Sequence, residues 1–332
     1  MGKKKNFQKV INKAVEITLI KKILHSLEPK EMLTGYNNEK PVFIIGPPRS
    51  GTTLIYQLIL GKFSFSYINR LMNLFYYAPF NTAKLSRYIS KFFSSDLNAQ
   101  NNYGTLPGVF SPDEGGKIWL NLIPGRDNTG YIPPMYCSEN QINELRKLII
   151  ETQEIFERPF INKRPSNSLR VAALQEAFPN ALFIIVVRDQ LYNAQSLYLA
   201  RQNRTVDKNG WWGSKPKEYP VISTYDSVRQ SVNQVYCILK QIDTDIQYFN
   251  NRYLLLKYED ICENPNIALD SITSFFLKHR LNVIDHENFH IPVLTNGNTI
   301  KIDIDVFEKL EKEVIEVFKQ SDLEMMRGVA RQ

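Results

Sequence analysis

Residues 42–54 of this sequence combine an apolar strand with a loop suited to binding phosphate. Four apolar residues, Val42 to Ile45, precede the segment Gly46–Leu54, which reads Gly-Pro-Pro-Arg-Ser-Gly-Thr-Thr-Leu. An apolar strand, a glycine-containing turn and the start of a helix form the layout of a phosphate-binding loop. Such a turn directs backbone N–H groups and the helix N-terminus toward an anion. The segment therefore predicts a phosphate site.

The loop differs from the nucleotidase pattern at the residue after its second glycine. In the pattern G-x-x-x-x-G-K-[ST] that residue is the lysine that reaches the β- and γ-phosphates of ATP. Gly46 and Gly51 have the required spacing, but Thr52 stands in the lysine position and Arg49 is the one cation of the loop. We therefore expect a nucleotide phosphate here, and a reaction other than ordinary ATP hydrolysis.

A second candidate phosphate contact follows the apolar run Leu182–Val187. Arg188 comes directly after this run, and Ser196 lies about two turns into the helix expected next. A guanidinium at a strand end and a hydroxyl two turns along a helix can hold one phosphate from two sides. Taken alone, Arg188 is equally well explained by a structural ion pair. Together with the lysine-free loop, the pair indicates a second phosphate site.

The elements that must position these residues form an alternating pattern. The runs at 42–45, 182–187 and 253–256 predict strands, and an unbroken apolar run is typical of a strand buried on both faces of a parallel sheet. Apolar residues at helical spacing predict helices at about 53–61, 139–157, 168–177, 190–201, 225–249, 266–278 and 305–319. This alternation predicts an α/β fold with a parallel sheet, whose ligands bind at the carboxyl ends of the strands.

The chain resembles the sulfotransferases that use 3′-phosphoadenosine 5′-phosphosulfate (PAPS), in particular the bacterial-type branch of the carbohydrate and protein sulfotransferases. The resemblance rests on Pro48–Leu54, on Arg188 with Ser196, and on Tyr258-Glu259-Asp260 after the third predicted strand. It extends from residue 42 to about 280. It implies a P-loop NTPase-like three-layer sandwich, with a central parallel sheet flanked by helices, and transfer of a sulfuryl group from PAPS to a hydroxyl or amine.

The resemblance also implies roles for individual residues. Arg188 and Ser196 correspond to the pair that holds the 3′-phosphate, Tyr258 belongs to the third-strand signature, and Lys301, with Asn298, corresponds to a C-terminal loop that closes over the cofactor. The residues implied to bind the 5′-phosphosulfate are Pro48, Arg49, Ser50, Gly51, Thr52 and Thr53.

The physical demands of sulfuryl transfer agree with these assignments. The main task is to stabilise negative charge that grows on the leaving phosphate. The loop N–H groups, the Arg49 guanidinium and the hydroxyls of Thr52 and Thr53 are suited to this task, and it requires no metal. By analogy with phosphoryl transfer, positioning and electrostatics are expected to dominate catalysis.

An acceptor hydroxyl also needs a general base. Residues 55–99 contain no His or Glu, and Asp113 and Glu114 in the segment Ser111–Gly116 are the first acidic pair after the loop. A neighbouring charge raises the pKa of one member of such a pair. We favour Glu114 as the base because its side chain reaches further; a solvated turn is the alternative.

Two further segments resemble parts of the acceptor side. Lys163, in Asn162-Lys163-Arg164-Pro165, resembles the lysine of a Lys-x-Pro segment that contacts the sulfuryl group or the acceptor in relatives. A surface lysine is the alternative. The segment Trp211–Pro216 resembles a loop that flanks the acceptor, where aromatic rings stack on sugar or purine faces; tryptophans of the core are the alternative. We thus predict Glu114, Lys163 and Arg49 as catalytic residues.

Composition limits the partners and the compartment. The chain has 332 residues and a net charge of +7, which suits anionic ligands, but it has no basic stripe or RNA-binding motif, so we expect no nucleic acid partner. Three widely spaced cysteines and no apolar run of ~20 residues predict reduced thiols in the cytoplasm and no membrane span. Residues 6–28 predict an amphipathic helix, and we favour packing on the domain over contact with a membrane surface.

The sequence predicts one main domain. We expect a helical extension at 1–35 and a single sulfotransferase-like domain at 36–332, with an irregular acceptor-site insertion at about 68–137 that is rich in aromatic residues, Asn, Gly and Pro. The acceptor partner is expected to be a glycan or another small molecule. Two alternatives stay open: a P-loop kinase or NTPase in which Asp189 holds Mg²⁺, and a nucleotide-binding protein without catalysis.

Overall fold

A four-stranded parallel sheet forms the centre of the computed structural model, which describes residues 26, 39–90, 108–204, 210–249, 251–287 and 289–319. Its strand order is β3-β1-β4-β5. The strands are β1 (Val42–Ile45), β3 (Ile161–Lys163), β4 (Leu182–Val187) and β5 (Tyr253–Lys257). β1 and β4, which consist of apolar residues, are buried on both faces because helices cover both sides of the sheet. The predicted α/β fold is confirmed.

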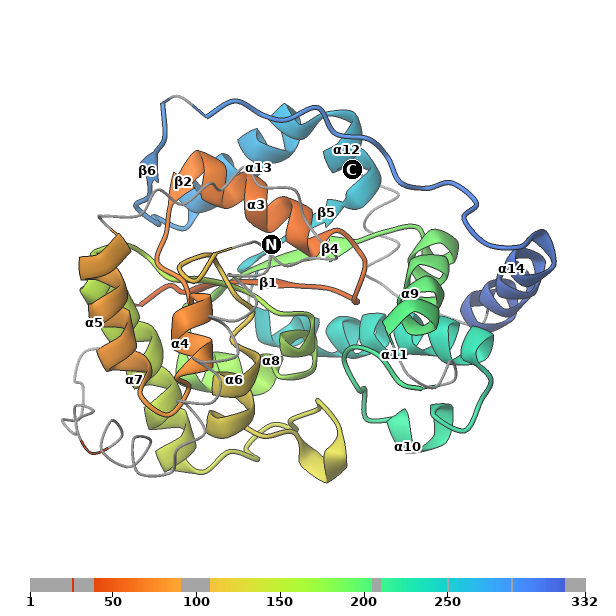
Figure 1. Cartoon of the computed structure of the whole chain (residues 1–332), viewed down its shortest axis with the longest axis horizontal. Coiled ribbons are helices and arrows are strands. Elements are labelled where there is room, and N and C mark those ends of the chain that lie inside the picture. Colours follow the sequence, from red (N-terminus) through yellow and green to blue (C-terminus); the bar gives the residue numbers. More distant parts are fainter. Residues whose placement is uncertain are drawn as a thin grey trace, which may run out of the picture.

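The side chains of β1 alternate between two hydrophobic layers. Phe43 and Ile45 belong to the core cluster that includes residues of α7, α8 and α11. Val42 and Ile44 belong to the cluster formed with α3 and α13. Because side chains of a strand point alternately to opposite faces, one apolar run supplies both layers. The result is a three-layer arrangement, visible in Figure 1 with α3 and α13 above the sheet and α8 and α11 below it.

Most predicted helices are present with shifted ends. The prediction at 168–177 is divided between a short 3-10 helix, η3, and α8. Outside the stretch 68–137, the described helices are α3 (Thr52–Lys62), α7 (Glu139–Phe156), η3 (Pro165–Leu169), α8 (Val171–Ala177), α9 (Gln190–Arg204), α10 (Tyr219–Ile222), α11 (Ser227–Asp245), η4 (Ile246–Phe249), α12 (Tyr258–Glu263), α13 (Pro265–Lys278) and α14 (Ile304–Lys319).

The stretch 68–137 is more regular than the sequence indicated. Its described parts contain α4 (Arg70–Leu74), α5 (Pro79–Ser90), α6 (Gly116–Leu122) and the 3-10 helix η2 (Arg126–Asn128). The insertion of an acceptor site at 68–137 stays a prediction. In the turn after α4, the rings of Phe75 and Tyr76 pack against the ring of Tyr77. Residues 91–107 lie outside the described part.

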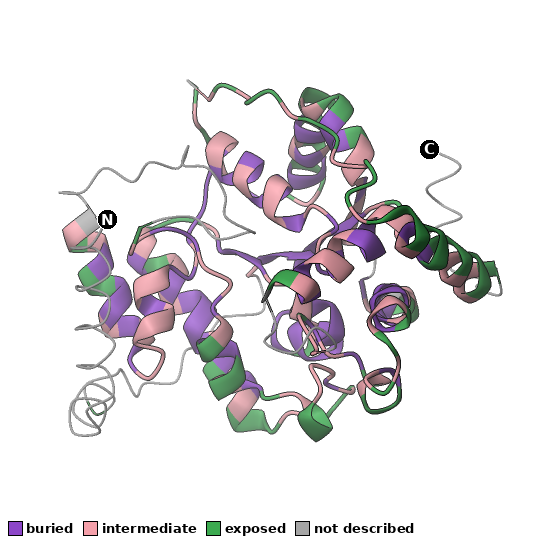
Figure 2. Cartoon of the chain, turned by 45° about the vertical axis from the view of Figure 1, so that its right-hand side comes forward, coloured by how far each residue is buried: buried purple, intermediate pink, exposed green. Residues whose placement is uncertain are grey.

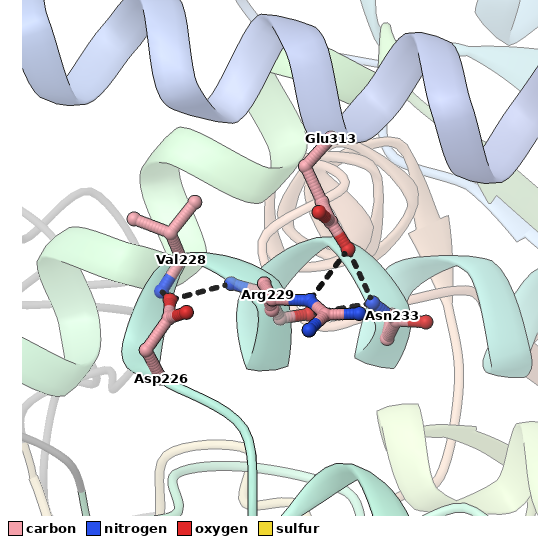
Figure 3. Close-up of polar contacts among 5 residues, drawn as sticks. All are labelled: Asp226, Val228, Arg229, Asn233 and Glu313. Atoms are coloured by element: carbon pink, nitrogen blue, oxygen red, sulfur yellow. Dashed lines mark hydrogen bonds and ion pairs between the residues drawn. The ribbon is translucent and has the colours of Figure 1, made fainter.

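The C-terminal part returns across the sheet and ends in a docked helix. After β6 (Ile284–Asp285), which pairs with β2 (Phe63–Ser64), an extended segment that we call the strap (289–303) leads to α14. Glu313 of α14 accepts a hydrogen bond of 3.1 Å from Asn233 and pairs with Arg229 at 3.4 Å, both on α11 (Figure 3). Asp226 caps the start of α11 by accepting from the backbone N–H groups of Val228 and Arg229.

Burial is concentrated in the sheet and the helix faces turned toward it, whereas α14, at the right of Figure 2, is mostly exposed. No helix among the described residues is long and apolar enough to cross a membrane. Cys137, Cys237 and Cys262 are free thiols. Apart from Ser26, the segment 6–28 and the predicted extension 1–35 lie outside the described residues.

Candidate active site

A cavity of about 520 Å³ opens where the parallel strands end. The loops after β1, β3, β4 and β5 all contribute to its lining, as expected for a ligand site of a parallel sheet. The predicted site residues that line it are Pro48, Arg49, Gly51, Thr52, Thr53, Glu114, Lys163, Arg188 and Tyr258. Ser50, Ser196 and Lys301 are not part of the lining; Ser50 lies between two lining residues, and Ser196 bonds to the lining residue Arg49.

The two glycines of the loop after β1 are required by close packing. Gly46 has a φ of +149°, and an added Cβ would stand 2.3 Å from the carbonyl oxygen of Val186 in β4. Gly51 has a φ of +98°, and an added Cβ would stand 2.6 Å from the ring of Tyr258. Positive φ and the absence of space both exclude a side chain at these positions. The loop is therefore pressed against β4 and α12, with α3 starting at Thr52.

Arg49 links the two predicted phosphate contacts. Its Nε donates to Ser196 Oγ at 3.1 Å, and its carbonyl oxygen accepts from Arg188 Nη1 at 3.2 Å. The Arg188 guanidinium also lies over the Tyr258 ring, 4.4 Å from its centroid, in a cation–π arrangement. Arg188 and Ser196 thus lie on the two sides of Arg49, and the sequence alone did not indicate that Arg49 stands between them.

The strap completes this half of the cavity. Asn298 Oδ1 accepts from Arg188 Nε at 2.8 Å, and Asn298 Nδ2 donates to Glu259 Oε1 at 2.7 Å. The backbone N–H of Gly297 donates to the Tyr258 hydroxyl at 3.0 Å. A Cβ added at Gly297 would lie 3.6 Å from both Arg188 Nη2 and Lys301 Nζ, so the Lys301 ammonium is close to Arg188.

The strap and the loop after β1 are both held by α9. Gln195 Nε2 donates to the carbonyl oxygen of Thr299 at 2.8 Å, and Gln195 Oε1 accepts from the backbone N–H of Lys301 at 2.9 Å. Asn193 Nδ2 donates to the carbonyl oxygen of Pro48 at 2.8 Å. Sequence reasoning missed Asn193 and Gln195, because a polar residue on a helix gives no signal of its distant partner.

The loop contains groups suited to an anion. Ser50 is fully buried and its hydroxyl has no hydrogen-bond partner among the described residues. A buried polar group without a partner is costly, and this hydroxyl belongs to the residue between Arg49 and Gly51, which both line the cavity. The N-terminus of α3, an eleven-residue helix, begins beside it at Thr52. Burial lowers the pKa of Arg188, and Tyr258 and Glu259 partly offset that shift.

On the β3 side of the cavity, Lys163 and Glu114 form an ion pair through Lys163 Nζ and Glu114 Oε1. The Lys163 side chain is 3% exposed and the Glu114 side chain 42% exposed. Asp113 accepts a hydrogen bond of 2.8 Å from the backbone N–H of Gly115, and burial raises its pKa. The two residues predicted for acceptor chemistry thus contact each other, while Asp113 shapes the turn.

The loop Trp212–Ser214 lines another part of the cavity. Gln234 Nε2 donates to the carbonyl oxygens of Trp212 and Ser214, at 3.1 and 2.6 Å. Gln234 in turn accepts from the fully buried Arg201, whose guanidinium lies over the Trp211 ring. The Trp211 side chain therefore packs on the domain, and Trp212 is the tryptophan that lines the cavity.

Sequence reasoning did not select Arg164, which lines the cavity, or Tyr56, which is buried near Asp113 and Glu114. Arg164 lines the cavity, and its Nε is buried without a partner among the described residues. Tyr56 in α3 is 3% exposed and its hydroxyl also has no partner there. Burial raises the pKa of Tyr56, and the nearby carboxylates of Asp113 and Glu114 add to the shift. Neither residue belongs to a local motif.

Comparison with known proteins identifies the class. Residues 41–277 match the model of the sulfotransferase family. This match covers more than half of the chain, and the chain therefore belongs to the sulfotransferase family. The resemblance stated from sequence is confirmed at this level.

Solved structures with a similar arrangement are bacterial sulfotransferases and sulfotransferase domains. Sulfotransferase STF9 from Mycobacterium avium is 15% identical, with a TM-score of 0.48 over 86% of this chain and 77% of that one. The sulfotransferase domain from the curacin biosynthetic pathway is 14% identical, with a TM-score of 0.42 over 85% of this chain and 97% of that one. Sulfotransferase STF1 from Mycobacterium tuberculosis H37Rv is 11% identical, with a TM-score of 0.45 over 84% and 77% of the two chains. No curated protein matches the sequence.

Proposed function

We propose that this sulfotransferase uses PAPS as its donor and transfers the sulfuryl group to a hydroxyl or amine of an acceptor. The observation that carries the proposal is the link between two anion-binding groups. Arg49 in the lysine-free loop bonds to Ser196 and accepts from Arg188, so two guanidinium groups meet at one cavity and would serve two phosphate groups. PAPS carries such groups at its 5′ and 3′ positions, whereas ATP has no 3′-phosphate.

The residues around Arg49 would hold the donor. The backbone N–H groups of the loop, Ser50 and the Thr52 and Thr53 hydroxyls would bind the 5′-phosphosulfate, and Arg188 with Ser196 would bind the 3′-phosphate. Tyr258 and Lys301 border the Arg188 side and would complete that contact. A guanidinium and fixed N–H groups aimed at the leaving phosphate stabilise the charge that develops there.

Glu114 and Lys163 would act on the reacting groups. Transfer forms a bond between the acceptor oxygen or nitrogen and sulfur, and breaks the bond between sulfur and the bridging phosphate oxygen. The acceptor proton passes to Glu114, and the electron pair of the broken bond leaves with adenosine 3′,5′-bisphosphate. Lys163, turning from Glu114 toward the bridging oxygen, offsets the charge on that oxygen and frees the Glu114 carboxylate.

The two alternative functions are less well supported. A kinase or NTPase would need Asp189 for Mg²⁺, but Asp189 Oδ1 caps α9 by accepting from the backbone N–H groups of Leu191 and Tyr192, at 3.0 and 3.1 Å. A binding protein without catalysis would not need the Glu114–Lys163 pair in its cavity. Within the proposal, the acceptor is a glycan or another small molecule and the reaction takes place in the cytoplasm.

Calorimetry with adenosine 3′,5′-bisphosphate and with ATP–Mg²⁺ tests the donor assignment. We expect metal-independent binding of the bisphosphate, and Arg188→Gln should weaken it about tenfold to a hundredfold, because a charge-assisted hydrogen bond to phosphate is lost. Arg126→Gln, which removes a charge from an exposed position outside the cavity, is the matched control. Preference for ATP–Mg²⁺, with no effect of Arg188→Gln, would overturn the proposal.

A further inference from the structure

The cation Arg164 is left over when the donor contacts are assigned. Among the described residues, the charged side chains that line the cavity are Arg49, Lys163, Arg164 and Arg188 against the carboxylate of Glu114. Arg49 bonds to Ser196 and accepts from Arg188 through its carbonyl oxygen, and Lys163 is paired with Glu114. Arg164 has no ion pair or side-chain hydrogen bond to any residue that the structure describes.

The position of Arg164 separates it from the 3′-phosphate side. Arg164 follows β3, whereas Arg188 follows β4 and Tyr258 follows β5. In the order β3-β1-β4-β5, the end of β3 is three strand spacings from the end of β5, roughly 14 Å at about 4.8 Å per spacing. The phosphate-binding loop after β1 stands between them. Arg164 therefore faces the part of the cavity that holds Glu114 and Lys163.

The surroundings of Arg164 give it no direct ion-pair partner among the described residues. Its Nε is fully buried, and its Nη1 would stand 3.0 Å from a Cβ added at Gly116, so the side chain lies against the glycine turn that follows Glu114. Burial lowers the pKa of Arg164, and Glu114 and Asp113 partly offset the shift. A buried hydrogen-bond donor without a partner lowers stability, and a bound anion that accepts from it removes this cost. The planar guanidinium matches the geometry of a carboxylate, sulfate or phosphate ester.

We propose that Arg164 is the anchor of an acceptor subsite for an anionic group, so that the acceptor carries a carboxylate, sulfate or phosphate near the atom that receives the sulfuryl group. This inference rests on the proposed sulfotransferase reaction and names the class of acceptor. Ser166 and Ser214, whose hydroxyls are 3.0 Å apart at the cavity wall, supply further donors beside Arg164. The anion can belong to an acidic sugar or to a small aromatic acid.

Paired acceptors that differ only in charge test the subsite. One pair is a hyaluronan oligosaccharide and its carboxyl-reduced form, and the other is 4-hydroxyphenylpropionate and its amide. We expect kcat/KM for PAPS-dependent sulfation to be about tenfold to a hundredfold higher for the anionic member of the pair that is used, as expected for a charge-assisted hydrogen bond. Arg164→Gln should abolish this ratio through KM, and Arg164→Lys should retain part of it.

The control and a binding measurement complete the test. Arg126→Gln should keep the wild-type ratio, because Arg126 is exposed outside the cavity. If no acceptor is turned over, calorimetry can measure acceptor binding to the wild type saturated with adenosine 3′,5′-bisphosphate. The anionic acceptor of at least one pair should bind. Its binding should be lost in Arg164→Gln and kept in Lys163→Met. Equal binding of charged and neutral members, no binding of either, or a ratio unchanged by Arg164→Gln would overturn the inference. Failure of the wild type to bind the bisphosphate would instead overturn the proposed donor.

Discussion

The two halves of the cavity differ in how far the protein satisfies its own polar groups. On the β4–β5 side, Arg188 bonds to Asn298 and to the carbonyl oxygen of Arg49, and Asn298 is itself fixed by Glu259. On the β3 side, the Nε of Arg164, a residue that lines the cavity, is buried without a partner among the described residues. Apart from the Ser50 hydroxyl, the protein's own contacts organise the first half, whereas the second half leaves the Nε of Arg164 for a ligand to satisfy.

This difference suits a two-substrate reaction. A donor that is the same in every turnover is best held by groups already fixed in place, since no ordering cost then falls on binding. An acceptor that must be distinguished from other molecules is recognised by buried groups that remain unpaired when the wrong molecule binds. The predictions below change one half at a time.

The largest effect is expected from Glu114→Gln on the acceptor side. Loss of a general base lowers kcat about 10²- to 10⁴-fold. The same change leaves the Lys163 ammonium, 3% exposed, without its carboxylate, so thermal unfolding should also shift to lower temperature. Steady-state kinetics with PAPS and calorimetric donor binding would separate the two halves, because the Kd of adenosine 3′,5′-bisphosphate should change far less than kcat.

Glu144→Gln on the exposed side of α7 is the control for this variant, since it removes a similar carboxylate away from the cavity. An unchanged kcat in Glu114→Gln would show that another group takes the acceptor proton.

An intermediate effect is expected from Asn298→Ala on the donor side. The variant removes the acceptor of the 2.8 Å hydrogen bond from Arg188 Nε and the donor to Glu259. Arg188 then loses its fixed orientation, and the Kd of adenosine 3′,5′-bisphosphate should rise about tenfold, as for the loss of one hydrogen bond to a charged group. Asn282→Ala, an exposed asparagine after α13, is the matched control. Equal affinities in the two variants would argue against a role of the strap in donor binding.

The sequence made the donor half visible because its signals are local. The loop 46–54 and the strand end at Arg188 are short segments in which residue type and spacing indicate phosphate binding. The strap contacts this half of the cavity through residues more than a hundred positions apart in sequence, such as Asn298 and Arg188. No local sequence pattern predicts such contacts. β3 was missed because three residues, Ile161–Lys163, are too few to show a strand pattern.

The acceptor half was visible only in part for a physical reason. Glu114 and Lys163 were chosen from residue type and resemblance, but their contact depends on the turn after Asp113 meeting the end of β3. Arg164 looks like any solvated arginine in sequence, and its importance comes from burial and from the lack of a partner. Burial and missing partners are properties of the packed structure, and no local pattern encodes them.

The smallest effect is expected from Glu313→Ala in α14, the helix that follows the strap. Glu313 holds α14 to α11 through Arg229 and Asn233, but the Arg229 side chain is 51% exposed, and such ion pairs contribute at most about 1 kcal/mol. The strap is also held close to the cavity by Gln195, which bonds to Thr299 and Lys301. Donor affinity in Glu313→Ala should therefore stay within about threefold of the Glu311→Ala control, since one weak contact is lost. A tenfold loss of donor affinity measured by calorimetry would mean that α14, and not Gln195, fixes the strap. The arrangement of the donor half would then depend on the C-terminal helix.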